Sequence, residues 1–237
     1  MPGATSLRWE FARDILDGMN PLRRSKLDKS HLTAGFHTRN VLPHLKRAGG
    51  AYFVTFRLAE TLPAEVLQQF KRERELIMAQ ALAAKRPLTW REQEELFRWY
   101  SERVDAYLDA GHGECFLKQP AVADMAAGAL KFFEGQRYEL RAWVVMPNHI
   151  HVVVWPMPPN PLSEILHSWK SYTATRANKL LARVGKPFWQ EESYDHLLRD
   201  DEDMARCCRY TIMNPVSARL CAQPEDWKWS SAYRAAP

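Results

Sequence analysis

Residues 137–155 decide the fold and read Arg-Tyr-Glu-Leu-Arg-Ala-Trp-Val-Val-Met-Pro-Asn-His-Ile-His-Val-Val-Val-Trp. Two apolar, β-branched segments, 137–145 and 149–155, predict a pair of strands. The short Met146-Pro147-Asn148 break between them is typical of a β-hairpin. The sequence therefore predicts that an antiparallel pair of strands forms the centre of the domain.

The segments on either side of this hairpin predict further elements. Residues 51–58 alternate aromatic and β-branched side chains and predict another strand. Apolar spacing predicts helices at about 121–133, at 162–184 and at 200–213, the last interrupted by Pro215; residues 187–199 are irregular or a short strand. This order is typical of an α+β fold with a ferredoxin-like antiparallel sheet and helices on one face.

Residues 64–84 and 89–109 predict two long, charge-rich helices separated at Pro87. Thr89 followed by Glu92 forms the pattern of a capping box at the start of the second helix. We interpret the pair as a helical hairpin inserted into a smaller fold.

Composition is that of an ordinary globular protein, with 46% hydrophobic and 26% charged residues. No apolar run approaches the roughly 20 residues that span a bilayer, and the N-terminus lacks the order of a signal peptide. The four cysteines have no metal-binding spacing. We therefore expect no membrane partner and a reduced, cytoplasmic protein.

The net charge of +5 is concentrated in two segments. Residues 1–50 predict a basic peripheral arm with one short helix, and residues 160–190 carry five Lys or Arg against Glu164 alone. Two basic segments on a balanced background favour a polyanionic partner, because counterions are released on binding. A basic, merely soluble surface explains the charge equally well.

His149 and His151 lie two positions apart on a predicted strand, so both imidazoles point to the same face. Two neutral imidazoles side by side form half of a metal site. The alternative is a pair of histidines at an edge with no role. Val153, where a third alternating histidine would stand, argues against a histidine-triad nucleotide hydrolase.

Two histidines and an oxygen ligand leave positions open for a phosphate oxygen on Mg²⁺ or Mn²⁺. The sequence has no Walker-type glycine loop, so the phosphoester is not predicted to be ATP. A tyrosine nucleophile suits DNA, because a 3′-hydroxyl can later displace the phosphotyrosine without a cofactor.

Two tyrosines are candidates for this role. Tyr210 lies on the last predicted helix with Asn214 one turn later, so both could face one metal. Asn214 before Pro215 could instead cap a new short helix. Tyr172 lies on the basic helix before Arg176, Lys179 and Arg183, which suits holding DNA. The residues alone leave the choice of tyrosine open.

The stretch 142–154, Ala-Trp-Val-Val-Met-Pro-Asn-His-Ile-His-Val-Val-Val, closely resembles the HUH motif of the IS200-type single-tyrosine (Y1) transposases, above all their REP-associated tyrosine transposase branch. Further blocks agree in order and spacing: Arg39-Asn-Val-Leu-Pro-His44, Lys170-Ser-Tyr-Thr173, Phe188-Trp-Gln190 and Tyr210-Thr-Ile-Met-Asn-Pro-Val216. The resemblance covers about 38–220. Arg219 stands where the family usually has glycine.

The resemblance implies that His149, His151 and Asn214 bind Mg²⁺ or Mn²⁺ and that Tyr210 is the nucleophile. It implies a basic arm over 1–50, a Y1 transposase catalytic domain over 51–220 with an insertion at about 62–112, and a C-terminal tail over 221–237. The expected DNA-binding residues are Arg39, Lys170, Tyr172, Arg176, Lys179, Arg183 and Trp189.

The resemblance also implies single-stranded or hairpin DNA as the partner, with palindromic repeats as substrates, and a nucleoid-associated location in the cytoplasm. Related transposases can complete their active sites across a dimer, so a homodimer is one expected assembly. Two alternatives stay open: a catalytically degenerate DNA-binding protein, and a metal phosphodiesterase that uses water on small substrates.

Overall fold

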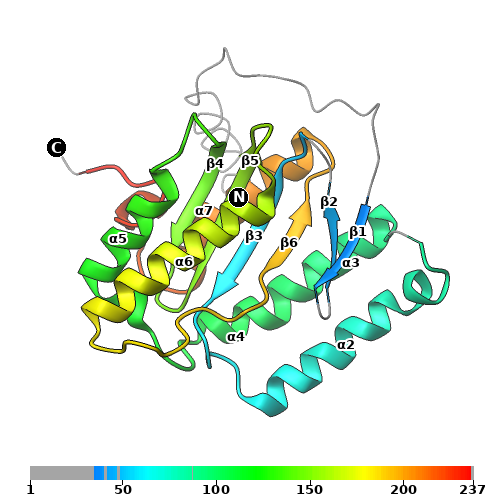
Figure 1. Cartoon of the computed structure of the whole chain (residues 1–237), viewed down its shortest axis with the longest axis horizontal. Coiled ribbons are helices and arrows are strands. Elements are labelled where there is room, and N and C mark those ends of the chain that lie inside the picture. The colour runs from blue at the N-terminus through cyan, green and yellow to red at the C-terminus, as the bar shows by residue number, and fades with distance from the viewer. Residues whose placement is uncertain (1–34, 40–41, 47–48, 87, 236–237) are drawn as a thin grey trace, which may run out of the picture.

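Four strands from three separate parts of the chain form one antiparallel sheet (Figure 1). The computed structural model describes residues 35–39, 42–46, 49–86 and 88–235. The strands are β3 (Tyr52–Arg57), β4 (Tyr138–Val145), β5 (His149–Pro156) and β6 (Tyr194–Leu197), in the order β4-β5-β3-β6. Helix α5 (Pro120–Lys131) precedes β4, and α6 (Leu162–Leu180) follows β5. This order and pairing confirm the predicted ferredoxin-like α+β fold.

One face of the sheet packs against α5 and α6, which lie side by side across it in Figure 1. Residues that alternate along β5, Ile150, Val152 and Val154, are fully buried in this core. Trp169 of α6 lies in the same core. The alternation then turns His149 and His151 toward the opposite face.

The opposite face is also covered, by α7 (Asp201–Ser217) and by the inserted segment. The insertion contains α2 (Ala64–Ala83), α3 (Trp90–Trp99), a π-helix η2 (Tyr100–Asp105) and α4 (Ala106–Asp109). Phe53 of β3 packs with Phe97 and Leu108 of the insertion and with Cys207 of α7. The predicted hairpin is therefore part of the core on this face. Among the described residues, no helix has the length and apolar character that a bilayer span requires.

The segments that flank the domain add short β pairings. Strands β1 (Gly35–Arg39) and β2 (Leu42–Lys46) form a separate antiparallel pair that the sequence did not predict. The short helix expected in the arm lies outside the described residues. At the other end, the tail runs along β4, since the Val145 N–H donates to the Trp229 carbonyl at 2.8 Å. The tail thereby covers an edge of the sheet that would otherwise be exposed.

Helix α7 continues through Pro215, although the sequence predicted an interruption there. Proline lacks the N–H that would donate to the Thr211 carbonyl, so the helix loses one hydrogen bond. That loss is tolerated because Pro215 lies close to the helix end. The next turn still closes, since the Ala218 N–H donates to the Asn214 carbonyl at 2.9 Å. Asn214 is consequently a helical residue, one turn after Tyr210, and not an N-cap.

Arg219, which stands where the resembled family usually has glycine, lies just after the end of α7. This residue has a φ of 58°, in the left-handed region that favours glycine. The Leu220 N–H donates to the Pro215 carbonyl at 2.8 Å, which closes the helix end around Arg219.

The capping box predicted at the start of α3 gives a stability test. The Glu92 N–H donates to Thr89 Oγ1 at 3.3 Å, and the Thr89 N–H donates to the Glu92 carboxylate at 2.7 Å. We expect Thr89→Ala to lower the free energy of unfolding by about 1 kcal/mol, measured by urea denaturation. Thr89→Ser keeps the acceptor and should stay close to the parent protein; equal losses in both variants would contradict the cap.

Candidate functional site

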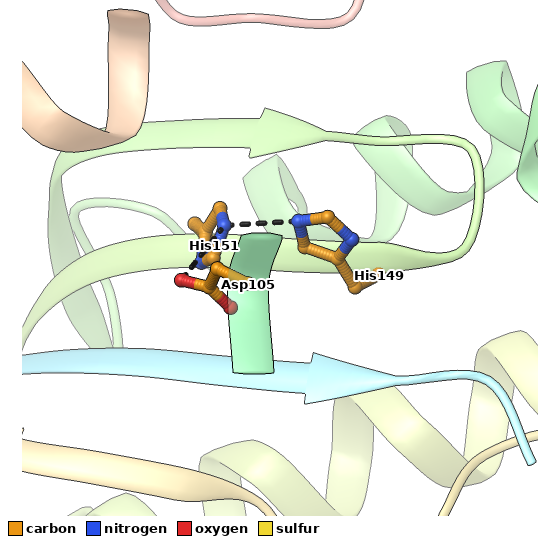
Figure 2. Close-up of side chains that lie close together, drawn as sticks. All are labelled: Asp105, His149 and His151. Carbon is orange, nitrogen blue, oxygen red and sulfur yellow. Dashed lines mark hydrogen bonds and ion pairs between the residues drawn. The ribbon is translucent and has the colours of Figure 1, made fainter. Parts of the chain in front are cut away.

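His149 and His151 face each other on β5 with both side chains fully buried. Their Nε2 atoms lie 3.0 Å apart, and Figure 2 shows the two rings turned toward one another with the Asp105 carboxylate beside them. Two ligand atoms at right angles around a metal, each at about 2.1 Å, are separated by about 3.0 Å. The histidine pair therefore has the spacing of two neighbouring metal ligands.

Hydrogen bonds on the far side of each ring hold this orientation. Asn148 Oδ1 lies 2.8 Å from His149 Nδ1, and Thr55 Oγ1 lies 2.8 Å from His151 Nδ1. The amide of Asn148 donates to the Leu108 carbonyl, so its oxygen must be the atom that meets the imidazole. His149 then carries its proton on Nδ1 and presents a lone pair at Nε2.

Burial keeps both imidazoles neutral. It lowers the pKa of His149 to about 3 and the pKa of His151 well below its ordinary value. Desolvation disfavours the charged imidazolium, the Asn214 side chain opposes it only in part at His149, and His149 adds to the lowering at His151. A neutral imidazole is the form that binds a metal.

The inserted segment brings two carboxyl groups to the histidines. Asp105 Oδ2 lies 3.8 Å from His151 Nε2, and Asp109 Oδ1 lies 3.8 Å from His149 Nε2. Asp105 ends the π-helix and Asp109 ends α4, so the two are one turn apart on a continuous helical segment. Burial raises the pKa of Asp109 to about 7 and raises that of Asp105 further from its ordinary value. Each carboxyl lacks a nearby cation that would favour its charged form.

Helix α7 adds Tyr210 and Asn214 from the other side. The Tyr210 hydroxyl donates a short hydrogen bond to Asp105 Oδ2, and its ring lies 5.6 Å from the His151 ring. The Asn214 side chain contacts both His149 and Asp109. The structure therefore brings together His149, His151, Tyr210 and Asn214, four residues that the sequence singled out.

The donor set fits a divalent cation. Asp105, His149 and His151 each offer a ligand atom, and these atoms lie within 4.8 Å of one another. Asp105 Oδ1, Asp109 Oδ1 and Asn214 Oδ1 are buried without a hydrogen-bond partner in the described part of the chain. Buried oxygens without partners are costly. Coordination of an ion by imidazole nitrogens and carboxyl or amide oxygens would remove that cost.

Sequence reasoning missed Asp105, Asp109, Asn148 and Thr55. The two aspartates follow Val104 and Leu108 at helical spacing, in a helix where charges are frequent, so they looked like solvated positions. Asn148 was interpreted as a turn residue. A usable signal was the four-residue spacing of two acids beside buried apolar positions, which predicts a shared face turned inward.

The predicted DNA-binding residues lie on α6 and after it, across the sheet from the histidines. Tyr172, Arg176 and Lys179 are exposed, with Tyr172 51% accessible. Other members of the set are engaged within the fold: Lys170 donates to the Gln190 and Glu191 carbonyls at 2.7 Å, Arg183 lies 4.1 Å from the Phe116 ring centroid, and buried Trp189 donates to Thr173. Arg39 lies in β1, and its side chain is outside the described part of the structure.

The Thr55 hydrogen bond supplies a test of the metal site. Thr55→Val keeps the shape of the side chain but removes the contact that orients His151, so Mn²⁺ affinity should fall by about 10- to 100-fold. Titration of free Mn²⁺ by electron paramagnetic resonance measures this change. Thr175→Val is the matched control, because the Thr175 hydroxyl is exposed and donates only to its own helix. Mn²⁺ binding that is equal in both variants would exclude this role for Thr55.

Comparison with known proteins finds similarity over the segment that carries the paired histidines. Residues 117–210 match the family described as "Transposase IS200 like". A REP-associated tyrosine transposase of Escherichia coli (strain K12) is 28% identical over 107 residues, covering 44% of this chain and 61% of that protein. A relative in Haemophilus influenzae is 28% identical over 109 residues, covering 41% of this chain and 60% of that protein. The chain thus matches about three fifths of the length of these curated relatives.

A solved structure of a REP-associated tyrosine transposase bound to a REP hairpin has a TM-score of 0.45 at 17% identity, over 79% of both chains. The fold assignment rests on the strand order and helix positions described above. Asp105, Asp109 and Asn214 lie outside the matched segment, which includes both histidines and ends at Tyr210. Over residues 117–210, this chain is similar to the IS200-like transposases.

Proposed function

We propose that this protein cleaves and rejoins single-stranded DNA through a 5′-phosphotyrosine at Tyr210. One observation carries the proposal: the Tyr210 hydroxyl and the His151 imidazole both approach the same carboxyl group, that of Asp105. A tyrosine beside a candidate cation site has what phosphoryl transfer requires, a nucleophile and stabilisation of the charge that develops. The match of residues 117–210 to the IS200-like transposases supports DNA as the substrate class.

The proposed cation is Mg²⁺ or Mn²⁺, held by His149, His151 and Asn214, with Asp105 and Asp109 as further oxygen donors. When bound, such an ion would polarise a non-bridging phosphate oxygen. The chain's own residues prepare that place: Asn148 and Thr55 orient the imidazoles, and burial keeps them neutral.

Proton transfer in the reaction falls to Asp105. Asp105 acts in its carboxylate form, which a bound cation would favour despite burial. As the Tyr210 oxygen attacks phosphorus, its proton passes to Asp105 Oδ2, which accepts its hydrogen bond. The bond from phosphorus to the 3′-oxygen breaks, and that oxygen takes a proton from water. In rejoining, a 3′-hydroxyl attacks the same phosphorus and returns its proton to the solvent hydroxide, the bond to Tyr210 breaks, and Tyr210 recovers its proton from Asp105.

The geometry favours Tyr210 over Tyr172. Tyr172 is exposed on α6, and α6 packs on the sheet face opposite to the one that carries the histidines. Tyr210 is half-buried, with ring contacts to His151, Phe53 and Phe97 that hold it beside the site. A rigidly held nucleophile needs less reorganisation to attack.

We propose hairpins of palindromic repeats as substrates, by analogy with the relatives named REP-associated. Exposed Arg176 and Lys179, with Tyr172 beside them, provide positive charge and an aromatic ring on α6. In this proposal they contact the backbone of the paired stem, while the unpaired strand passes around the sheet to Tyr210. The reaction would take place in the cytoplasm, at the nucleoid.

The test is a covalent adduct between the protein and a labelled repeat-hairpin single strand in the presence of Mn²⁺, detected after denaturation. Tyr210→Phe removes only the hydroxyl, so the adduct should disappear while DNA affinity stays within a few-fold of the parent protein. The lost hydrogen bond to Asp105 should cost about 1 kcal/mol of stability, and a melting curve controls for it.

Tyr172→Phe is the matched control and should retain the adduct. An adduct that persists in Tyr210→Phe but disappears in Tyr172→Phe would reverse the assignment. Failure of the parent protein to form any adduct in this assay would argue for one of the rival functions, the degenerate DNA-binding protein or the phosphodiesterase that uses water.

A further inference from the structure

A second concave site lies beside the candidate metal centre, between the inserted helix α2, the π-helix and the strands β3 and β6. The pocket has a cavity volume of about 60 Å³ and is open to solvent on one side. A cavity of that size accepts a small group such as a phosphate, and the rest of a nucleotide would lie at its open mouth. Neither the histidines nor Tyr210 line it, so the proposed catalytic residues leave it unexplained.

Two buried arginines give the pocket its chemistry. Arg74 is only 8% exposed, and its Nε and Nη2 atoms have no hydrogen-bond partner in the described part of the chain. Arg57 is 9% exposed, and its Nη1 donates to Thr61 Oγ1 at 3.1 Å. A buried guanidinium without a partner is costly. An anion bound between the two guanidinium groups would offset that cost.

The charge and shape of the lining identify the class of ligand. Among the lining residues, Arg57, Lys71 and Arg74 are cationic and Glu192 is acidic, so the pocket keeps a positive balance. Guanidinium groups match the oxygens of a phosphate in geometry and charge. Half-buried Trp99 also lines the pocket and presents an aromatic surface. Together these residues fit a phosphate group whose attached base lies against an aromatic side chain at the mouth of the pocket.

The position of the pocket connects it to the candidate site. The pairing of β3 with β5 sets Thr55 opposite His151 and Arg57 opposite His149. Thr55 both lines the pocket and meets His151 Nδ1 at 2.8 Å. One side chain therefore separates the two sites. A single strand bound at Tyr210 would have a neighbouring nucleotide within reach of the pocket.

We propose that this pocket binds the phosphate of an unpaired nucleotide next to the scissile phosphate, with Arg57 and Arg74 on that phosphate and Trp99 beside the base at the open mouth. The proposal rests on the proposed function for the identity of the strand. Of the lining residues, only Glu192, Ser193 and Tyr194 lie in the segment matched to the family, so the inserted helices supply most of the site. The insertion would thereby give this chain a contact that the matched core does not provide.

The experiment compares Arg74→Met with Arg72→Met in binding a fluorescent twelve-residue oligothymidylate. Both variants lose one charge from α2, but Arg72 is exposed whereas Arg74 faces the pocket. Arg74→Met should weaken binding about tenfold or more. Arg72→Met should stay within about twofold, because exposed charges are screened at physiological salt. Equal affinities of the two variants would overturn the proposal.

Two further measurements separate this site from a structural role and from the proposed function. Arg74→Met should melt at the same temperature as the parent protein or higher, because the substitution removes a buried charge whose Nε and Nη2 atoms lack partners. If Arg74→Met does not fold, Arg57→Met takes its place and must lose affinity for the oligothymidylate by the same factor. Thymidine 5′-monophosphate should protect the parent protein against thermal unfolding more than inorganic phosphate or thymidine does. Equal protection by all three probes would overturn nucleotide binding. Affinity is read without cleavage, so a missing Tyr210 adduct would refute the proposed function alone.

Discussion

The side chain of Asn148 holds the site together, because it joins the hairpin, the metal-ligand geometry and the insertion in one set of hydrogen bonds. Its amide donates to the Leu108 carbonyl at 2.9 Å and to the His112 carbonyl at 3.2 Å, and its oxygen meets His149 at 2.8 Å. The inserted helices are thereby fixed against the turn between β4 and β5. The positions of Asp105 and Asp109 beside the histidines depend on that attachment, which explains why a turn residue is fully buried.

One face of the sheet contributes mainly to stability, and the other carries the candidate site. One face is filled by Ile150, Val152 and Val154 against α5 and α6, where apolar burial dominates. The other face carries two neutral histidines and two carboxyl groups with raised pKa values, all of which burial penalises. Titratable groups with strongly shifted pKa values are frequent in active sites. The aromatic contacts of Phe53 and Phe97 around Tyr210 keep this face packed despite that cost.

The sequence predicted those features that depend on local patterns. Period-two alternation located β3, β4 and β5, and the same alternation placed His149 and His151 on one face. Helical spacing placed Asn214 one turn after Tyr210. The positions of Asp105 and Asp109 could not be predicted, because they depend on how the insertion docks on the sheet. Lys170 and Trp189 looked available for DNA, whereas long-range contacts with the 190–191 carbonyls and Thr173 engage them in the fold.

The central claim is that the inserted helices complete a metal site whose other half is the histidine pair. Mn²⁺ affinity of Asp105→Asn and Asp109→Asn, measured by electron paramagnetic resonance, tests it most directly. Asp201→Asn serves as the control, since Asp201 is exposed at the start of α7. Each site variant should bind Mn²⁺ about tenfold or more weakly, because each removes a charged oxygen donor. Parent-like Mn²⁺ affinity in both Asp105→Asn and Asp109→Asn would contradict the account.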